Sequence, residues 1–383
     1  MKIHIFIVCC IIFSLPSKSQ RCQVGQQFIH TSDGAKLSPR DQILYVQTVF
    51  HIISEDSSHS ISNDKIFQQL QILNDFYSNR NLSQDPTLPE VYRKLAACPK
   101  IHFCLANKDP LGNPTTAITK TQTTIQNIGC RQNMTTYFVM KESLGGIDIW
   151  DPAKYLNIFI ADRVDCTLGE AVLPEDATKS KDGIIIDPRF FGYNFLHSPY
   201  HLGLTLVHEV GHYLGLLHLS PNENCSSDDG ISDTPIQETN YRHCPEYPQI
   251  SCGNEAMVQN IMCLVDDYCM KFFTKGQCER MRNVLLTQRA NVTMSNCQSQ
   301  NIESKDDWRI INVYDGWMLK YQGNPIAALH YKLFNINGQL IHHHTFRDQQ
   351  TFYIPEQGLP LPSGVYMIEL NYENRNSVLK LIH

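Results

Sequence analysis

The spacing of apolar residues changes along the chain and divides it into two parts. In the first part, the apolar run 42–53 predicts a strand, and apolar residues at helical spacing behind Ser62 predict a helix. Further strands are expected at 100–106, 155–161 and 183–186, separated by loops rich in Gly, Pro, Thr and Asn. One long helix after the first strand favours an α+β domain with a mixed sheet and few helices.

Two more helices are expected later in this part. Residues 202–217 are apolar on more than one side, which predicts a largely buried helix. Thr274 is a suitable cap for a helix over 275–288. Polar loops dominate the chain between these two helices.

The pattern changes after Cys297. Residues 298–307 are polar and linker-like, and beyond them short apolar runs alternate with turns. Asn337-Gly338 between two such runs is a strong hairpin signal. We therefore expect a separate, small all-β sandwich at 308–383.

The first residues have the layout of a secretory signal peptide. A short basic start precedes an almost wholly apolar stretch at 3–15, and the small residues Ser17 and Ser19 follow. The apolar stretch is too short to span a bilayer, and a buried N-terminal strand is the alternative. We expect a signal peptide at 1–19, a pro-segment or arm at 20–41, and a mature protein that is secreted or held at the cell surface.

Composition narrows the class of protein. The 383 residues suffice for two domains, and 42% hydrophobic with 18% charged residues is typical of a globular protein. A net charge of −6 and the lack of a basic block interleaved with aromatic residues argue against nucleic acid as the main partner. Fourteen cysteines suit an oxidising compartment, where they staple loops as disulfides. A zinc finger is disfavoured because no Cys-x-x-Cys pair occurs.

A constellation of histidines indicates a metal site. His208 and His212 are four residues apart on the helix expected at 202–217, so both imidazoles leave the same face. Gly215 can adopt the left-handed conformation that ends a helix, and it brings His218 round as a third ligand. Three histidines fit zinc and leave its fourth position open for water and substrate.

The residue beside the first histidine completes the chemistry. Glu209 is placed to act as general base towards a metal-activated water, which predicts hydrolysis of a peptide bond. Core histidines on an apolar helix are the structural alternative, and the spacing of all three makes it weak. Met262 lies downstream and is expected to form a methionine turn beneath the metal.

The extended zinc motif and Met262 resemble the metzincin clan, and the surrounding segments resemble its pappalysin family over about residues 42–290. The matching segments are Leu73-Asn74-Asp75-Phe76, Ile101 to Ala106, Tyr155 to Ile158, Asp182-Gly183-Ile184, Ser232 to Pro235 and Phe273 to Met281. The resemblance implies a two-part catalytic domain at 42–297, with a cleft between the parts. The upper part would hold a twisted mixed sheet and the active-site helix, and the lower part would be loop-rich.

The same resemblance implies further sites in the lower part. It implies the disulfides Cys225–Cys252 and Cys244–Cys269, and a calcium site at Asp229 and Thr234. An oxygen-rich run at 228–230 supports calcium, and an ordinary solvated loop is the alternative.

Two positions depart from the family pattern or match it in part. Cys22 resembles the pro-segment cysteine that blocks the zinc in related zymogens, although its sequence context matches only partly, and a structural disulfide is the alternative. Leu264 stands where family members often have a tyrosine that helps stabilise the tetrahedral intermediate. Tyr268 is a candidate to replace it.

The C-terminal domain resembles the sorting domain of type IX secretion substrates. The matching segments are Phe334 to Gln339, Leu361 to Tyr366 and Val378 to Ile382. This resemblance implies the outer-membrane secretion machinery as a partner, and a substrate- or carbohydrate-binding sandwich is the alternative. Proteins or peptides are the expected substrates of a monomeric enzyme. An inactive zinc-binding adhesin and a zinc hydrolase for non-peptide bonds are the other hypotheses.

Overall fold

The structure is a computed structural model that describes most of the two expected domains. It describes residues 42–55, 61–78, 88–130, 137–164, 166–194, 197–297, 308–313, 316–321, 326–349, 351–355, 365–373 and 375–382. The expected signal peptide, the pro-segment with Cys22 and the linker 298–307 lie outside these residues.

The first domain is built on a seven-stranded mixed sheet around β1 (Leu44–Ser54). Its path runs β11-β1-β5-β7-β6, and β3 and β4 also pair with β1 in parallel, one at each end. The other strands are β3 (Ile101–Leu105), β4 (Ile118–Gln122), β5 (Leu156–Ile160), β6 (Gly169–Ala171), β7 (Ile184–Ile186) and β11 (Thr293–Met294). Strands β6 and β11 are antiparallel to their neighbours, so the expected mixed sheet is confirmed.

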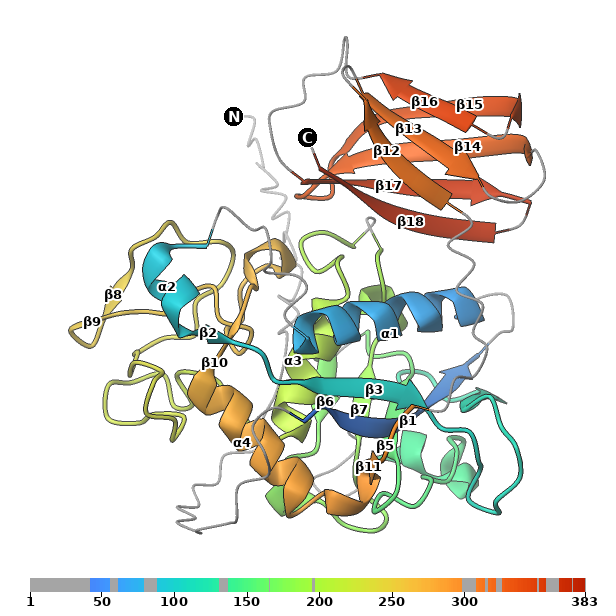
Figure 1. Ribbon diagram of the computed structural model, residues 1–383. Helices are drawn as coiled ribbons and strands as arrows, with labels where there is room; N and C mark the ends of the chain where they lie inside the picture. Colours follow the sequence, from blue (N-terminus) through green and yellow to red (C-terminus); the bar gives the residue numbers. More distant parts are fainter. Residues whose placement is uncertain are drawn as a thin grey trace, which may run out of the picture.

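Four α-helices accompany this sheet (Figure 1): α1 (Asn63–Tyr77), α2 (Glu90–Leu95), α3 (Leu204–Tyr213) and α4 (Lys275–Leu286). The Ser62 side chain caps α1, and Thr274 and Gln277 form a capping box at α4. Helices α1 and α3 pack together, and the Tyr77 hydroxyl donates a hydrogen bond to the carbonyl of Val207. The caps at Ser62 and Thr274 confirm the predicted helix starts.

The buried helix expected at 202–217 is shorter than predicted. Gly203 is its N-cap with a φ of 74°, and the helix ends at Tyr213. Gly215 follows with a φ of 83°, in the left-handed region that glycine tolerates best. Leu202 and Leu217 therefore lie in the loops on either side of the helix. The prediction included them because the apolar residues continue beyond both ends of the helix.

The part of the domain around 220–270 is mainly loop. It contains short two-residue strands: β2 (Ala96–Ala97) with β10 (Phe273–Thr274), and β8 (Ile250–Ser251) with β9 (Asn254–Glu255). The disulfides Cys225–Cys252 and Cys244–Cys269 are both present here, as the resemblance implied. The upper and lower parts of the expected fold are thus confirmed.

The C-terminal domain packs two antiparallel sheets over one apolar core. One sheet has the order β12-β13-β16 and the other β15-β14-β17-β18. The strands are β12 (Trp308–Val313), β13 (Gly316–Tyr321), β14 (Ile326–Asn335), β15 (Leu340–Gln349), β16 (Thr351–Pro355), β17 (Val365–Tyr372) and β18 (Arg375–Ile382). The all-β prediction is confirmed. Within the described residues of both domains, no helix has the length and apolar character needed to cross a membrane.

Candidate active site

The three histidines of the motif converge on one point. His208 and His212 project from α3, and His218 comes from the chain after Gly215. The Nε2 atom of His208 lies 3.0 Å from that of His212 and 3.2 Å from that of His218, and the last two Nε2 atoms are also 3.2 Å apart. Ligand nitrogens around a tetrahedral zinc with bonds of about 2.0–2.1 Å are roughly 3.3 Å apart. The three side chains therefore fit a zinc ion.

Backbone carbonyls orient two of these imidazoles. The Nδ1 atom of His208 donates to the carbonyl of Ile261 at 2.8 Å, and that of His212 donates to the carbonyl of Leu216 at 2.7 Å. With Nδ1 carrying the proton, the Nε2 lone pair is free to bind a metal. Burial lowers the pKa of His212 to about 4, although the hydrogen bond to Leu216 opposes the shift, so this imidazole stays neutral.

Met262 packs directly beneath α3. A Cβ added at Gly211 would lie 2.5 Å from Met262 Sδ, so only glycine allows this approach. Asn260 holds the turn, because its side-chain oxygen accepts from the Met262 amide at 2.9 Å and its carbonyl accepts from the Cys263 amide. Since Ile261 in the same turn binds His208, the methionine turn and the metal site form one unit.

Glu209 is fully buried and faces the edge of the sheet. A Cβ at Gly169 of β6 would lie 2.8 Å from Glu209 Cγ and 3.0 Å from Oε1. The glutamate and the edge strand are therefore in direct contact. Sequence reasoning missed Gly169, because a glycine in a three-residue strand has no pattern of its own.

A buried ion pair holds this edge strand in place. The guanidinium of Arg163 lies 3.2 Å from Glu170 Oε2. It also donates hydrogen bonds to the backbone carbonyl oxygen and to the hydroxyl oxygen of Thr167. The Tyr137 hydroxyl donates to the other oxygen of Glu170. Cys130–Cys166, a disulfide whose pairing the sequence left open, crosses the same region.

The residues expected to bind calcium lie together in the lower part. Thr234 donates through its hydroxyl to Asp229 Oδ1 at 2.7 Å, and the Ile231 amide donates to the same oxygen. Asp229 Oδ2 is buried and has no hydrogen-bond partner within the described part of the chain. Burial raises the pKa of Asp229 to about 7, although the bond from Thr234 opposes the shift. A cation would supply the missing partner.

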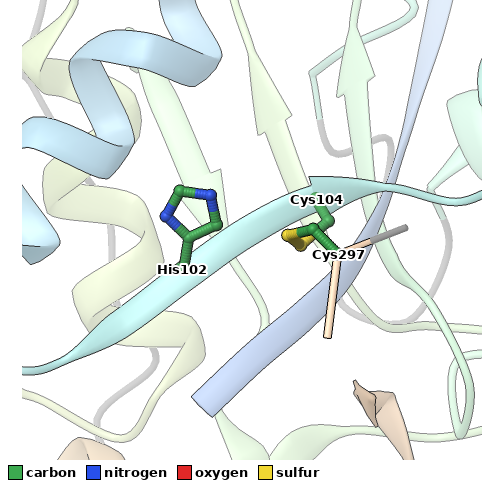
Figure 2. Close-up of side chains that lie close together, drawn as sticks. All are labelled: His102, Cys104 and Cys297. Atoms are coloured by element: carbon green, nitrogen blue, oxygen red, sulfur yellow. A yellow bond between two sulfur atoms is a disulfide. The ribbon is translucent and has the colours of Figure 1, made fainter. Parts of the chain in front are cut away.

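A second group of side chains of the types that bind metals contains a disulfide. His102, Cys104 and Cys297 lie close together (Figure 2), but Cys104 and Cys297 form a disulfide. This bond ties the segment after β11 to β3 and leaves no thiolate for a metal. Of the remaining described cysteines, Cys98, Cys263 and Cys278 are outside disulfides.

Comparison with known proteins agrees with this site. The model of the M43 peptidase family, described as pregnancy-associated plasma protein-A, matches residues 142–286, which include the three histidines. The structure of mature mirolysin of Tannerella forsythia with a cleaved peptide is 35% identical, with a TM-score of 0.61 over 67% of this chain and 97% of that one. The chain belongs to the M43 peptidase family, the pappalysins.

Other relatives of this M43 peptidase are metalloproteases as well. An extracellular metalloprotease of Arthroderma gypseum is 27% identical over 62% of this chain and 71% of the relative. A promirolysin variant of T. forsythia is 34% identical, with a TM-score of 0.60, over 66% of this chain and 83% of that one. This M43 peptidase is therefore a metalloendopeptidase, and its fold matches that of mirolysin.

Proposed function

We propose that this M43 peptidase is a secreted zinc endopeptidase in which His208, His212 and His218 bind the metal. The observation that carries the proposal is the convergence of three Nε2 atoms at 3.0–3.2 Å. The nitrogen-only donor set and the neutral His212 favour zinc over calcium or magnesium, which prefer oxygen ligands. Gly215 and Met262 have structural roles in this proposal, at the turn before His218 and beneath α3.

His208, His212 and His218 would hold the zinc ion, which would supply the Lewis acidity that lowers the pKa of a water and polarises a carbonyl. Glu209 is the general base in the proposal: its carboxylate takes a proton from the attacking water and returns it to the leaving amine. Its position against Gly169 supports this role, since the carboxylate then lies between α3 and the strand along which a substrate would run.

The arrangement of β6 supports a peptide as the substrate. Among the described residues, β6 is the last strand on its side of the sheet, and there it pairs with β7 alone. A peptide can add to such an edge through main-chain hydrogen bonds. Because Gly169 contacts Glu209, a peptide on this edge would bring a scissile bond close to the proposed base.

The proposal is tested by incubating purified, processed protein with denatured casein or gelatin, with and without a zinc chelator. Cleavage that stops with chelator and returns with zinc supports an endopeptidase, and peptide-library mapping then gives its preference. Bound zinc without cleavage of any peptide would favour an inactive adhesin. Turnover of esters alone would favour a hydrolase for non-peptide bonds.

We also propose that Cys22 keeps a zymogen latent by occupying the open zinc position. The solved promirolysin shows that a family relative has a pro-form. Cys22 itself lies outside the described residues. We expect the Cys22→Ala pro-protein to cleave casein before any processing, with the cleaved wild-type protein as the positive control. A latent Cys22→Ala pro-protein would assign Cys22 to a structural disulfide instead.

The calcium proposal rests on Asp229 and Thr234. Without a cation, burial raises the Asp229 pKa to about 7 from an ordinary 3.8, so folding favours the protonated form. Stability contributed by this group is therefore lost as pH rises from about 4 to 7, and the loss is complete above pH 7. A bound cation reverses this penalty because it favours the carboxylate.

We accordingly expect calcium to stabilise the protein mainly at high pH. Calcium at about 100 times its Kd contributes about 2.7 kcal/mol, which raises the Tm by roughly 5–10 °C. Thermal unfolding at pH 8 and pH 5.5, with calcium or with a calcium chelator, measures the effect. The increase should be smaller at pH 5.5 and absent in Asp229→Asn. Glu246→Gln changes an exposed carboxylate of the same part of the domain and should show the wild-type increase, which provides the control.

Export is the last part of the proposal. We propose a signal peptide at 1–19, a pro-segment at 20–41, a catalytic domain at 42–297, a linker at 298–307 and a sorting domain at 308–383. The sandwich fold of the last domain is consistent with either a sorting or a carbohydrate-binding role. Intact-mass analysis of exported protein separates the two, because a sorting domain is removed on export and a binding domain is retained.

A further inference from the structure

The turn between β14 and β15 is closed by hydrogen bonds among its own residues. The Asn335 amide donates to the carbonyl of Gln339, and the Gly338 amide donates back to the carbonyl of Asn335, each at 3.0 Å. The Asn335 side chain accepts from the amides of Asn337 and Gln339. The conformation of this hairpin tip is therefore supported by hydrogen bonds within the C-terminal domain itself.

This tip touches the catalytic domain. The Ser198 hydroxyl donates to the carbonyl of Asn337 at 2.7 Å. A Cβ added at Gly338 would lie 3.2 Å from the Ser198 Cβ and 3.3 Å from two ring atoms of His201. His201 is fully buried, so its imidazole is covered although it belongs to a loop. Ser198 and His201 together form what we call the socket.

The socket belongs to the loop that leads into the active-site helix. Gly203, two residues after His201, is the N-cap of α3, and Gln69 of α1 donates to its carbonyl at 3.0 Å. Asp267 binds the loop from the other side, since its Oδ2 accepts from the Leu202 amide at 2.8 Å and its amide donates to the carbonyl of Pro199. These hydrogen bonds connect the loop that holds the socket to the start of the helix that carries His208.

A second point of contact joins the same two domains. Glu369 of β17 is near enough to Lys65 of α1 to raise the pKa of that amine, against the larger effect of burial, which lowers it. Glu369 also pairs with Lys332 at 3.7 Å. Figure 1 shows the sheet with β17 and β18 directly over α1. The two contacts are carried by different strands, so together they orient the C-terminal domain.

We infer that the C-terminal domain is an internal ligand of the catalytic domain: the Asn337-Gly338 turn docks in the Ser198–His201 socket and braces the loop before the active-site helix. The partner that fits this surface is a glycine-containing β-hairpin of this chain, because Ser198 donates to a main-chain carbonyl there and a Cβ at position 338 would lie only 3.2–3.3 Å from Ser198 and His201. The socket and the Asn337-Gly338 turn contain none of the proposed metal ligands.

Cross-linking tests the docked arrangement in the full chain. The separation of 3.2 Å between the Ser198 Cβ and a Cβ at position 338 is close to the roughly 3.5–4.5 Å that a disulfide spans. We expect Ser198→Cys with Gly338→Cys to cross-link when oxidised glutathione accepts the two electrons and two protons. Mass spectrometry of unreduced peptides then identifies the 198–338 link among native disulfides.

The control pairs Ser198→Cys with Glu373→Cys, which lies in the turn at the other end of the same sheet. The register pairs Asn335 with Tyr366 and Leu329 with Tyr372, so the two turns are about six residues, or roughly 20 Å, apart. This pair is expected not to link. Equal yields for both pairs, or no 198–338 link, would overturn the docking.

Amide hydrogen exchange tests the bracing in a chain that keeps its native socket. Gly338→Leu places a side chain against Ser198 and His201, at a φ of 75° that also disfavours it. We expect the amides of Leu202, Gly203 and Leu204 to exchange at least tenfold faster than in wild type. The β17 amides report whether the C-terminal domain itself remains folded. If the 198–338 cross-link forms but the amides of Leu202, Gly203 and Leu204 exchange at the wild-type rate in Gly338→Leu, the domains touch without bracing the loop. That result would overturn the bracing part of the inference.

Discussion

Glu209→Gln is expected to lose activity by about 10²–10⁴-fold in kcat while zinc content stays at the wild-type level. Glutamine keeps the size of the side chain but cannot take a proton from water at neutral pH. Because Glu209 is fully buried between α3 and Gly169, the isosteric change should leave the packing intact. Initial rates on a fluorogenic peptide, together with zinc determined by elemental analysis, separate loss of the base from loss of the metal.

Two further variants define the meaning of that result. Glu175→Gln changes an exposed glutamate of the same domain and should keep full activity. His212→Ala should lose both zinc and activity, because it removes one of three converging nitrogens. Wild-type rates in Glu209→Gln would rule out this glutamate as the base, and zinc loss in that variant would make Glu209 a part of the metal site.

The features that local sequence specifies were predictable. The spacing of His208 and His212 follows from the helical period alone, and the caps at Ser62 and Thr274 act within one turn of their own helices. The pairs Cys225–Cys252 and Cys244–Cys269 came from resemblance rather than from the residues themselves. The resemblance implied no partner for Cys104 or Cys297, which lie 193 positions apart in the sequence, so the pairing of these two cysteines was left open.

The features that depend on tertiary contact were not predictable. Strand β6 has three residues, and its place over Glu209 is set by pairing with β7 and by the buried Arg163–Glu170 pair. The start of α3 at Leu204 depends on Asp267, which binds the loop before it from a distant part of the chain. A local apolar pattern contains neither piece of information.

A missed signal explains the one error in the C-terminal domain. The apolar runs taken as strands of this domain begin at residue 327, so β12 and β13 were not predicted. Asp315-Gly316 between them is nevertheless a hairpin signal in the sequence. Trp317, Leu319 and Tyr321 are buried at alternate positions, as expected for a strand with one face in the core. Here the period-two pattern was present, and tertiary context was not needed to find it.

The second large effect is expected on stability, at a buried ion pair that joins α3, α4 and the sheet. Arg289 is almost fully buried; it binds both oxygens of Asp182, and it donates to the carbonyls of Tyr213 and Val172. Its guanidinium also lies 3.6 Å from the centre of the Tyr213 ring. Burial raises the pKa of Asp182, and Arg289 opposes that shift, so the carboxylate depends on this one cation.

Arg289→Met should therefore destabilise the protein by about 3–5 kcal/mol, because it leaves Asp182 buried without its partner. For a domain of this size the loss corresponds to a fall in Tm of roughly 6–20 °C, measured by calorimetry. Lys94→Met breaks an exposed pair with Glu90 and should cost under about 1 kcal/mol, which makes it the control. Arg289→Met with Asp182→Asn removes both charges and should recover part of the loss. If the double variant is as unstable as the sum of the two single variants, the charges are not coupled, and the hydrogen bonds to Tyr213 and Val172 account for the effect instead.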